Sequence, residues 1–242
     1  MRILEYDSLS STNSEISRLI ADGKNLCDGD IVVCSEQTAG RGQRGNSWEA
    51  EPGKNLTFSI FLKPKNLLAA DSFLLSMAVS VGITEALNNL LEPQRVRIKW
   101  PNDIYWNDSK LVGILIENSF TGSIVNHSII GIGVNVNQKI FLSDAPNPIS
   151  MSRIAGHDFN LKTVLNEIGQ TILNYVSKDL TSLTDTYYNM LWRNDGSYLW
   201  HEPDGRPFSA SIEAVKPSGH LVLKTESADL RTYAFKEVFP VI

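Results

Sequence analysis

The sequence contains few of the residues that build disulfides and metal sites. Its 242 residues include two cysteines, Cys27 and Cys34, and four histidines. The cysteines follow neither a CxxC nor a zinc-knuckle spacing, and the histidines show no HxxxH or similar pattern. We therefore predict no disulfide framework and no metal site built by side chains, and we expect the reducing environment of the cytoplasm.

The sequence also lacks an excess of basic residues. It has 22 lysines and arginines against 27 aspartates and glutamates, a net charge of −5. Binding to a nucleic-acid duplex needs a basic surface that displaces counterions from the phosphates. General nucleic-acid affinity is therefore not expected, and any anion site has to be local.

Nothing in the sequence favours export or a membrane span. Glu5 and Asp7 interrupt the apolar core that a signal peptide would need. The best span candidate, residues 72–84, is uncharged over 13 positions but contains three serines. A transmembrane helix requires roughly 18–20 apolar residues, so we expect no membrane segment.

The residues that are present predict an α+β protein. Apolar residues recur at helical spacing in four segments, at about 13–22, 71–91, 160–176 and 183–192. Strand-like apolar runs occupy five segments, 30–37, 55–63, 95–100, 111–118 and 128–137. Thr12 and Glu15 match the capping-box pattern, which predicts that Thr12 caps the first helix.

The pattern changes near residue 195. Four short strand-like runs follow, at 198–202, 208–215, 220–226 and 230–239, separated by the turn sequences PDGR, KPSG and SAD. Such spacing is typical of a small β-barrel or β-sandwich. We therefore predict two domains, residues 1–194 and 195–242.

A cationic loop, TAGRGQRGNSW at residues 38–48, joins two of the predicted strands. Its glycines and arginines are Gly40, Gly42, Gly45, Arg41 and Arg44. The glycines allow the backbone to approach a ligand closely and the arginines supply charge, a combination suited to phosphate or carboxylate. A flexible hairpin tip with solvated arginines is the alternative. The GxGxxG match carries little weight, because the loop lies between strands without the helix of a dinucleotide fingerprint.

Two further stretches place polar residues at strand ends. In KWPNDIYWNDSKLVGIL, residues 99–115, Pro101 ends a strand and the turn NDSK delivers Lys110 to the next one. The spacing lets Asp103 and Lys110 face one another across a hairpin base, with a surface ion pair as the alternative interpretation. GIGVNVN, which contains Asn135, is either a ligand-facing strand end or a bulged core strand with an asparagine turn.

Taken together, these motifs resemble a known family. STN at 11–13, EQTAGRGQRGNSW, KWPNDIYW with SKLVGILIE, and GIGVNVN, in this order and with these separations, resemble the catalytic domain of the biotin protein ligases. The resemblance covers residues 1–190. It implies a class II synthetase-like mixed sheet with flanking helices, and the β-rich tail resembles the small C-terminal SH3-like β-barrel of the family.

The resemblance implies a two-step reaction. The carboxylate of biotin attacks the α-phosphate of ATP, which carries Mg²⁺, to give biotinyl-5′-AMP and pyrophosphate. A lysine of a biotin carboxyl carrier protein, usually a subunit of acetyl-CoA carboxylase, then takes the biotinyl group. Some members dimerise through an edge of the central sheet, so the sequence leaves open a homodimer as well as the identity of the carrier.

The same resemblance implies roles for individual residues. Arg41, Lys110 and Asp103 are the catalytic ones, with Asp103 accepting the proton of the carrier lysine or orienting its amine. The implied biotin site consists of Ser11, Thr12, Asn13, Gln37, Gly40, Arg41, Lys110, Gly113 and Gly133. The implied ATP site consists of Arg41, Arg44, Trp48, Asn102, Asp103, Lys110 and Asn135, with Trp48 closing over the nucleotide.

The sequence departs from the family at Gln43 and Asn46, where many members have arginine, and we expect faster escape of the adenylate. STN begins at residue 11, so the DNA-binding domain and repressor function of the bifunctional members are not expected. A lipoate or octanoate ligase is the closest alternative. A non-catalytic biotin-binding regulator and a carrier-docking module built on the tail are others, and the presence of Lys110 and Arg41 favours an enzyme.

Overall fold

The computed structural model describes residues 1–43, 46–142 and 147–242. Its larger sheet has seven strands in the order β1-β2-β3-β7-β6-β5-β4. Their bounds are β1 (Ile3–Leu9), β2 (Asp30–Gln37), β3 (Leu56–Leu62), β4 (Arg97–Lys99), β5 (Asp103–Trp106), β6 (Ser109–Thr121) and β7 (Ile124–Val134). Strands β1 and β2 are parallel and the other neighbours are antiparallel, so the sheet is mixed.

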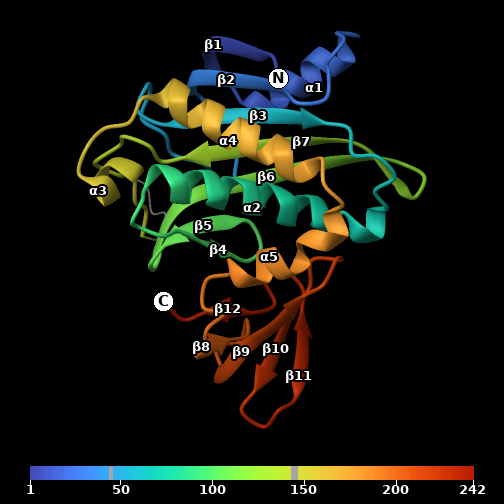
Figure 1. Ribbon diagram of the computed structural model, residues 1–242, viewed down its shortest axis with the longest axis vertical. Helices are drawn as coiled ribbons and strands as arrows, with labels where there is room; N and C mark the ends of the chain where they lie inside the picture. The colour runs from blue at the N-terminus through green and yellow to red at the C-terminus, as the bar shows by residue number, and fades with distance from the viewer. Residues whose placement is uncertain (44–45, 143–146) are drawn as a thin grey trace.

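Helices cover this sheet and connect it to the tail. Their bounds are α1 (Thr12–Ala21), the 3-10 helix η2 (Ala69–Asp71), α2 (Phe73–Leu90), α3 (Met151–Ala155), α4 (Leu161–Val176), the 3-10 helix η3 (Leu180–Leu183) and α5 (Thr184–Asn189). Helices α2 and α4 run side by side across one face of the sheet (Figure 1). Their close approach needs Gly82, because a Cβ there would lie 2.9 Å from the Cα of Ile172.

Residues 69–90, which include α2, are long and apolar enough to cross a membrane by length and composition alone. However, 67% of the most apolar part is buried inside the molecule. Helix α2 packs against α4 and the sheet, and its buried residues belong to the main hydrophobic core. This is the position of the core helix of a globular domain.

The tail forms a second, antiparallel sheet in the order β11-β10-β9-β8-β12. Its strands are β8 (Ser197–His201), β9 (Pro207–Val215), β10 (Leu221–Thr225), β11 (Leu230–Tyr233) and β12 (Phe239–Pro240). The indole Nε1 of Trp100 donates to the carbonyl of Gly219 at 2.9 Å, and its ring meets the edge of Phe235. The end of β4 is thereby joined to the tail, below the large sheet in Figure 1.

The predicted α+β class, with a large mixed sheet and a small β-rich tail, is confirmed. The division into domains at 194/195 stays a prediction. Two short strands, β1 and β5, were not predicted, and the run predicted as one strand at 230–239 divides into β11 and β12. Strand β1 is an edge strand with mostly half-buried or exposed residues, and β5 has four residues, so neither shows a long apolar run.

The capping-box prediction is wrong. Ser11 is the N-cap of α1, and its side chain makes no capping hydrogen bond. The Thr12 hydroxyl instead donates to Gln37 Oε1 at 3.2 Å. The Glu15 carboxylate accepts hydrogen bonds from Arg18 and Tyr6. Gln37 therefore binds the Thr12 side chain, and Tyr6 and Arg18 bind that of Glu15, so neither side chain caps the helix.

Candidate active site

The alternation of residues along the central strands separates the main core from a large cavity. In β3 and β7, Phe58, Ile60, Ile130 and Ile132 belong to the core with α2 and α4. The residues between them point to the opposite face, as strand geometry requires. Thr57, Gly131 and Gly133 from that face line a cavity of about 870 Å³, together with the start of α1.

Glycines form the floor of this cavity because aromatic and amide groups lie directly on the strands. A Cβ on Gly133 would come within 2.3 Å of the Trp48 indole, and one on Gly113 within 2.7 Å. A Cβ on Gly131 would lie 2.6 Å from Asn13 Oδ1. Trp48 therefore packs on the two glycines predicted to bind biotin. Its Nε1 is buried and has no hydrogen-bond partner within the described part of the chain.

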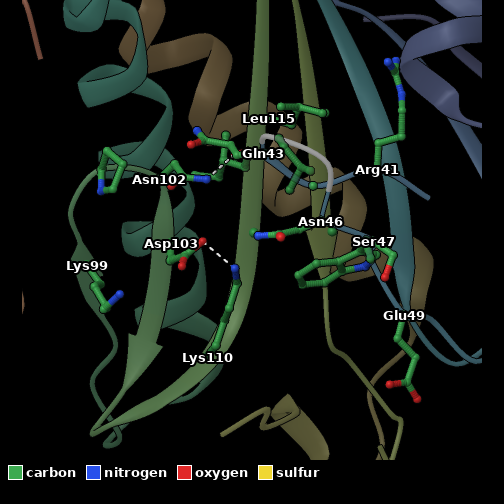
Figure 2. A pocket seen from close by; sticks show the side chains of 18 of the residues that line it. Arg41, Gln43, Asn46, Ser47, Glu49, Lys99, Asn102, Asp103, Lys110 and Leu115 are labelled. Carbon is green, nitrogen blue, oxygen red and sulfur yellow. Dashed lines mark hydrogen bonds and ion pairs between the residues drawn. The ribbon is translucent and has the colours of Figure 1, made fainter. Parts of the chain in front are cut away.

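Asp103 and Lys110 meet at the edge of this floor. The Lys110 Nζ lies 2.7 Å from Asp103 Oδ1, and the exposed fractions of the two side chains are 26% and 14%. Figure 2 shows them pointing at one another from β6 and β5. The pairing of β5 with β6, in which Asp103 lies opposite Gly113, sets this geometry. The predicted contact across the hairpin base is present, and it lines the cavity instead of the outer surface.

Lys99 is a second lysine of the cavity that sequence reasoning missed. It lies opposite Asp103 in the β4–β5 register, and its Nζ is 4.9 Å from the centroid of the Tyr105 ring. Burial lowers the pKa of Lys99, with Lys110 acting in the same direction and Asp103 against it. The sequence contained a signal that Lys99 belongs to the site. Lys99 is the first residue of KWPND, and it alternates along the strand with the buried Ile98.

Asn102 and Asn135 brace β6 from either side. Asn102 Nδ2 donates to the carbonyl of Ile114 at 2.7 Å, and the backbone N–H of Ile114 donates back to Asn102. Asn135 Nδ2 reaches the carbonyl of Lys110 at 3.5 Å, whereas its Oδ1 is buried without a hydrogen-bond partner among residues 1–43, 46–142 and 147–242. Both asparagines also line the cavity, and both contact the backbone of β6, the strand that carries Lys110.

A neutral polar network forms the other end of the cavity. Gln37 Oε1 accepts hydrogen bonds from the backbone N–H of Thr12 at 2.8 Å and from its hydroxyl. The fully buried Ser59 lies 2.6 Å from both Thr12 Oγ1 and Asn13 Oδ1. Asn13 Nδ2 donates to Glu117 at 2.6 Å. Sequence reasoning missed Ser59 and Glu117, although a serine inside the apolar run LTFSIFL is a visible signal.

The structure does not bring Arg41 to Lys110. Its guanidinium lies 3.4 Å from Glu117 Oε1 and from Ser14 Oγ, and the side chain is 48% exposed. In Figure 2 it points away from Lys110. Of the other predicted residues, Gly40 approaches Trp48 and Gln37 without lining the cavity, and Arg44 lies outside the described residues.

Arg41 and the remaining predicted residues all line the cavity; the others are Ser11, Thr12, Asn13, Gln37, Trp48, Asn102, Asp103, Lys110, Gly113, Gly133 and Asn135. Gln43 and Asn46, where the sequence departs from the family, line it as well. The cavity thus has a neutral end rich in hydrogen-bonding groups and an end with lysines. Such an arrangement suits a polar organic molecule that carries an anionic group.

Comparison with known proteins assigns the chain to a family. It belongs to the biotin/lipoate A/B protein ligase family, whose model matches residues 7–135. It is 35% identical over 174 residues to the bifunctional ligase/repressor BirA of Bacillus subtilis, covering 69% of this chain and 51% of the relative. It is 35% identical over 159 residues to the biotin–acetyl-CoA-carboxylase ligase of Paracoccus denitrificans, covering 61% of each. The chain therefore spans about half to three fifths of the length of these relatives.

Solved structures share the whole fold. The biotin protein ligase of Aquifex aeolicus in complex with biotin and ATP superposes with a TM-score of 0.79 at 23% identity, covering 99% of both chains. The biotin protein ligase of Leishmania major in complex with biotinyl-5-AMP gives a TM-score of 0.65 at 23% identity, covering 96% of this chain and 98% of that one. The similarity includes the C-terminal sheet, because almost the entire chain is covered.

Proposed function

We propose that this protein is an ATP-dependent biotin ligase that modifies a lysine of a biotin carboxyl carrier protein through biotinyl-5′-AMP. The observation that carries the proposal is the union in one cavity of the Asp103–Lys110 pair with the neutral network of Thr12, Asn13 and Gln37. The ureido ring of biotin is neutral and rich in hydrogen-bonding groups, whereas its other end is a carboxylate. The two ends of the cavity match the two ends of this substrate.

The first step joins two anions. A carboxylate oxygen of biotin bonds to the α-phosphorus of ATP, and the bond from that phosphorus to the β-phosphate bridge breaks to release pyrophosphate. A carboxylic acid with a pKa of about 4 is already ionised at pH 7, so no general base is needed. Positive charge at the meeting point is needed, since fixed cations stabilise charge most strongly in a site sheltered from water. Lys110 and Lys99 supply it, and Mg²⁺ arrives bound to ATP.

No group of three or more His, Cys, Asp or Glu side chains able to hold a metal ion exists within the described residues. The acidic residues that line the cavity there are Asp103 and Glu49. This donor set does not fit a resident metal centre. Mg²⁺ is therefore treated as part of the nucleotide substrate.

The second step transfers the biotinyl group. The amine of the carrier lysine bonds to the carbonyl carbon of the adenylate, and the bond from that carbon to AMP breaks. A free lysine has a pKa of about 10.4, so its ammonium has to lose a proton before attack. Asp103 is the carboxylate at the reacting end, and it accepts this proton or orients the amine while Lys110 remains on the phosphate.

The names of the relatives support the substrate and the partner. The Paracoccus denitrificans relative is named for acetyl-CoA carboxylase, and the Aquifex aeolicus structure holds biotin and ATP. A cytoplasmic location agrees with the two free cysteines, Cys27 and Cys34. We also propose that the protein acts without general affinity for nucleic acids and that it forms a homodimer.

The direct test is modification of the carrier. Purified protein is incubated with Mg-ATP and a biotin carboxyl carrier protein, together with biotin or lipoate, and the intact carrier is weighed by mass spectrometry. We expect the mass to rise by one biotinyl group only with biotin and ATP. A rise only with lipoate would assign the chain to the lipoate branch of its family, and no rise with either would refute ligase activity.

A further inference from the structure

Glu117 connects two segments that are far apart in the sequence. It lies on β6, outside the cavity lining, opposite Ile129 of β7. Its Oε2 accepts the hydrogen bond from Asn13 Nδ2, whereas its Oε1 lies 3.4 Å from Arg41 Nη2. One carboxylate therefore contacts both the start of α1 and the glycine-rich loop.

The contact with Asn13 fixes the direction of a buried amide. Asn13 is 3% exposed, and its Oδ1 faces the hydroxyl of the fully buried Ser59. An ionised carboxylate can only accept hydrogen bonds, so it holds Nδ2 toward Glu117 and Oδ1 toward Ser59. The amide lies directly on Gly131, where a Cβ would come within 2.6 Å of Asn13 Oδ1. Glu117 thus sets the orientation of Asn13 at the neutral end of the cavity.

The contact with Arg41 is of a different kind. The pair is half-exposed, at 48% and 39%, and its charged atoms are 3.4 Å apart. Ion pairs of this type contribute little to stability, so exchanging the partner costs little. Arg41 lines the same cavity as Lys110, so an anion bound at Lys110 is a second partner toward which the guanidinium can turn. Glu117 and that anion would compete for Arg41.

We propose that Glu117 is a positioning residue with two separable tasks. One oxygen holds Asn13 in the orientation that the biotin end of the cavity requires. The other is the resting counter-ion of Arg41, which the arginine exchanges for the phosphate of the nucleotide. The inference rests on the proposed function, because it assigns the neutral end to biotin and the cationic end to ATP.

The substitutions Glu117→Gln and Glu117→Ala separate the two tasks. Glutamine keeps an oxygen that accepts from Asn13 but removes the charge facing Arg41, whereas alanine removes both. We expect Glu117→Gln to bind inorganic pyrophosphate and ATP about two- to fivefold more tightly at low salt, the size expected for an exposed ion pair. Its affinity for biotin should equal that of the wild type, whereas Glu117→Ala should bind biotin more weakly.

Isothermal titration calorimetry with pyrophosphate, ATP and biotin measures these affinities without requiring turnover. The gain in pyrophosphate affinity should disappear when Glu117→Gln is combined with Arg41→Met. The proposal is overturned if the gain is absent, if it persists without Arg41, or if glutamine and alanine weaken biotin binding equally. Thermal unfolding checks that each variant is folded. Absence of carrier modification by the wild type would instead refute the proposed function, while the pyrophosphate result would still report on Arg41.

Discussion

At the scale of single residues, the site depends on the charges around Asp103. This carboxylate pairs with Lys110 at 2.7 Å and lies opposite Lys99 in the sheet. Its two lysine neighbours lie on the same face as the glycine floor. If the proposed function is correct, the local balance of charge links binding of the nucleotide phosphates with the later loss of a proton from the carrier lysine.

Asp103→Asn should slow the transfer step. The amide cannot accept the proton of the carrier lysine, and the loss of a general base typically costs a factor of about 10²–10⁴. Single-turnover transfer from preformed biotinyl-5′-AMP to the carrier measures this step alone. A variant that forms the adenylate poorly but transfers it at the normal rate would show that Asp103 has no role in transfer.

Lys99→Met should raise thermal stability at pH 7. Burial holds the pKa of Lys99 below its ordinary value, so the unfolded chain binds this proton more strongly than the folded protein. The resulting loss in free energy of unfolding is complete at pH values below the pKa of Lys99 in the folded protein. It fades as the pH rises to the pKa of a lysine in the unfolded chain, about 10.4. Urea unfolding should show that Lys99→Met and the wild type differ less in free energy of unfolding near pH 10.5 than at pH 7. Equal stability of both proteins at pH 7 would contradict a burial cost.

Sequence reasoning located the contact of Asp103 with Lys110 because the two residues are only seven positions apart, on either side of a turn. It could not locate the contact of Asn13 with Glu117, which bridges 104 positions of the sequence. The partners of Ser59 and Gly131 were missed for the same reason, although Ser59 itself stands out as a serine in an apolar run. Their importance depends on α1 folding back onto β3 and β7, which no local pattern reveals.

At the scale of elements, β6 and β7 act as the floor on which the loop rests. The loop contacts the strands through Trp48. The indole ring can pack directly on the strands because Gly113 and Gly133 lack side chains. The order of the loop and the shape of the cavity are therefore coupled.

Gly133→Ala should displace Trp48 from the sheet. The new methyl group would lie 2.3 Å from the nearest indole atom, closer than any real contact, so the ring has to move. We expect altered tryptophan fluorescence and weaker biotin binding. Gly196→Ala is the matched control, since its Cβ would meet nothing closer than 3.8 Å. If Gly133→Ala lowers stability equally in a Trp48→Ala background, the clash with Trp48 is not the cause.

Elements with a long apolar pattern were predictable. Strands β2 and β3 and helices α2 and α4 all appear where periodicity placed them, and Asn160, the first residue of the range predicted for α4, caps that helix by accepting a hydrogen bond from the backbone N–H of Thr163. The start of α1 was mispredicted because its polar residues serve the cavity, which local propensity does not include. Where residues that would normally cap a helix contact other parts of a site instead, predictions from local sequence fail.

At the scale of the whole molecule, the C-terminal tail takes part in the site through the turn between β11 and β12. Phe235, Lys236 and Val238 line the same cavity as Lys110. Trp100 holds the two parts together through Gly219 and Phe235. The tail therefore completes the cationic end of the cavity.

Trp100→Ala should destabilise the protein and loosen the tail. Removing a buried tryptophan costs about 3–5 kcal/mol, and Trp100 is 9% exposed. We expect a lower free energy of unfolding and a higher KM for ATP, since Lys236 and Phe235 would no longer be held at the cavity. Denaturant unfolding and steady-state kinetics measure the two effects. A normal KM for ATP in a destabilised variant would show that the tail does not contribute to the site.

The central claim is that Lys110 and its neighbours promote adenylation of biotin. Biotin-dependent exchange of labelled pyrophosphate into ATP measures this step without the carrier. We predict exchange with biotin and not with lipoate, and a decrease of about 10²–10³-fold in Lys110→Ala, the cost of removing one charge-stabilising group. Lys162→Ala, which removes a 73% exposed lysine outside the cavity, should exchange at the wild-type rate. Exchange that is independent of biotin, or undiminished in Lys110→Ala, would contradict the account.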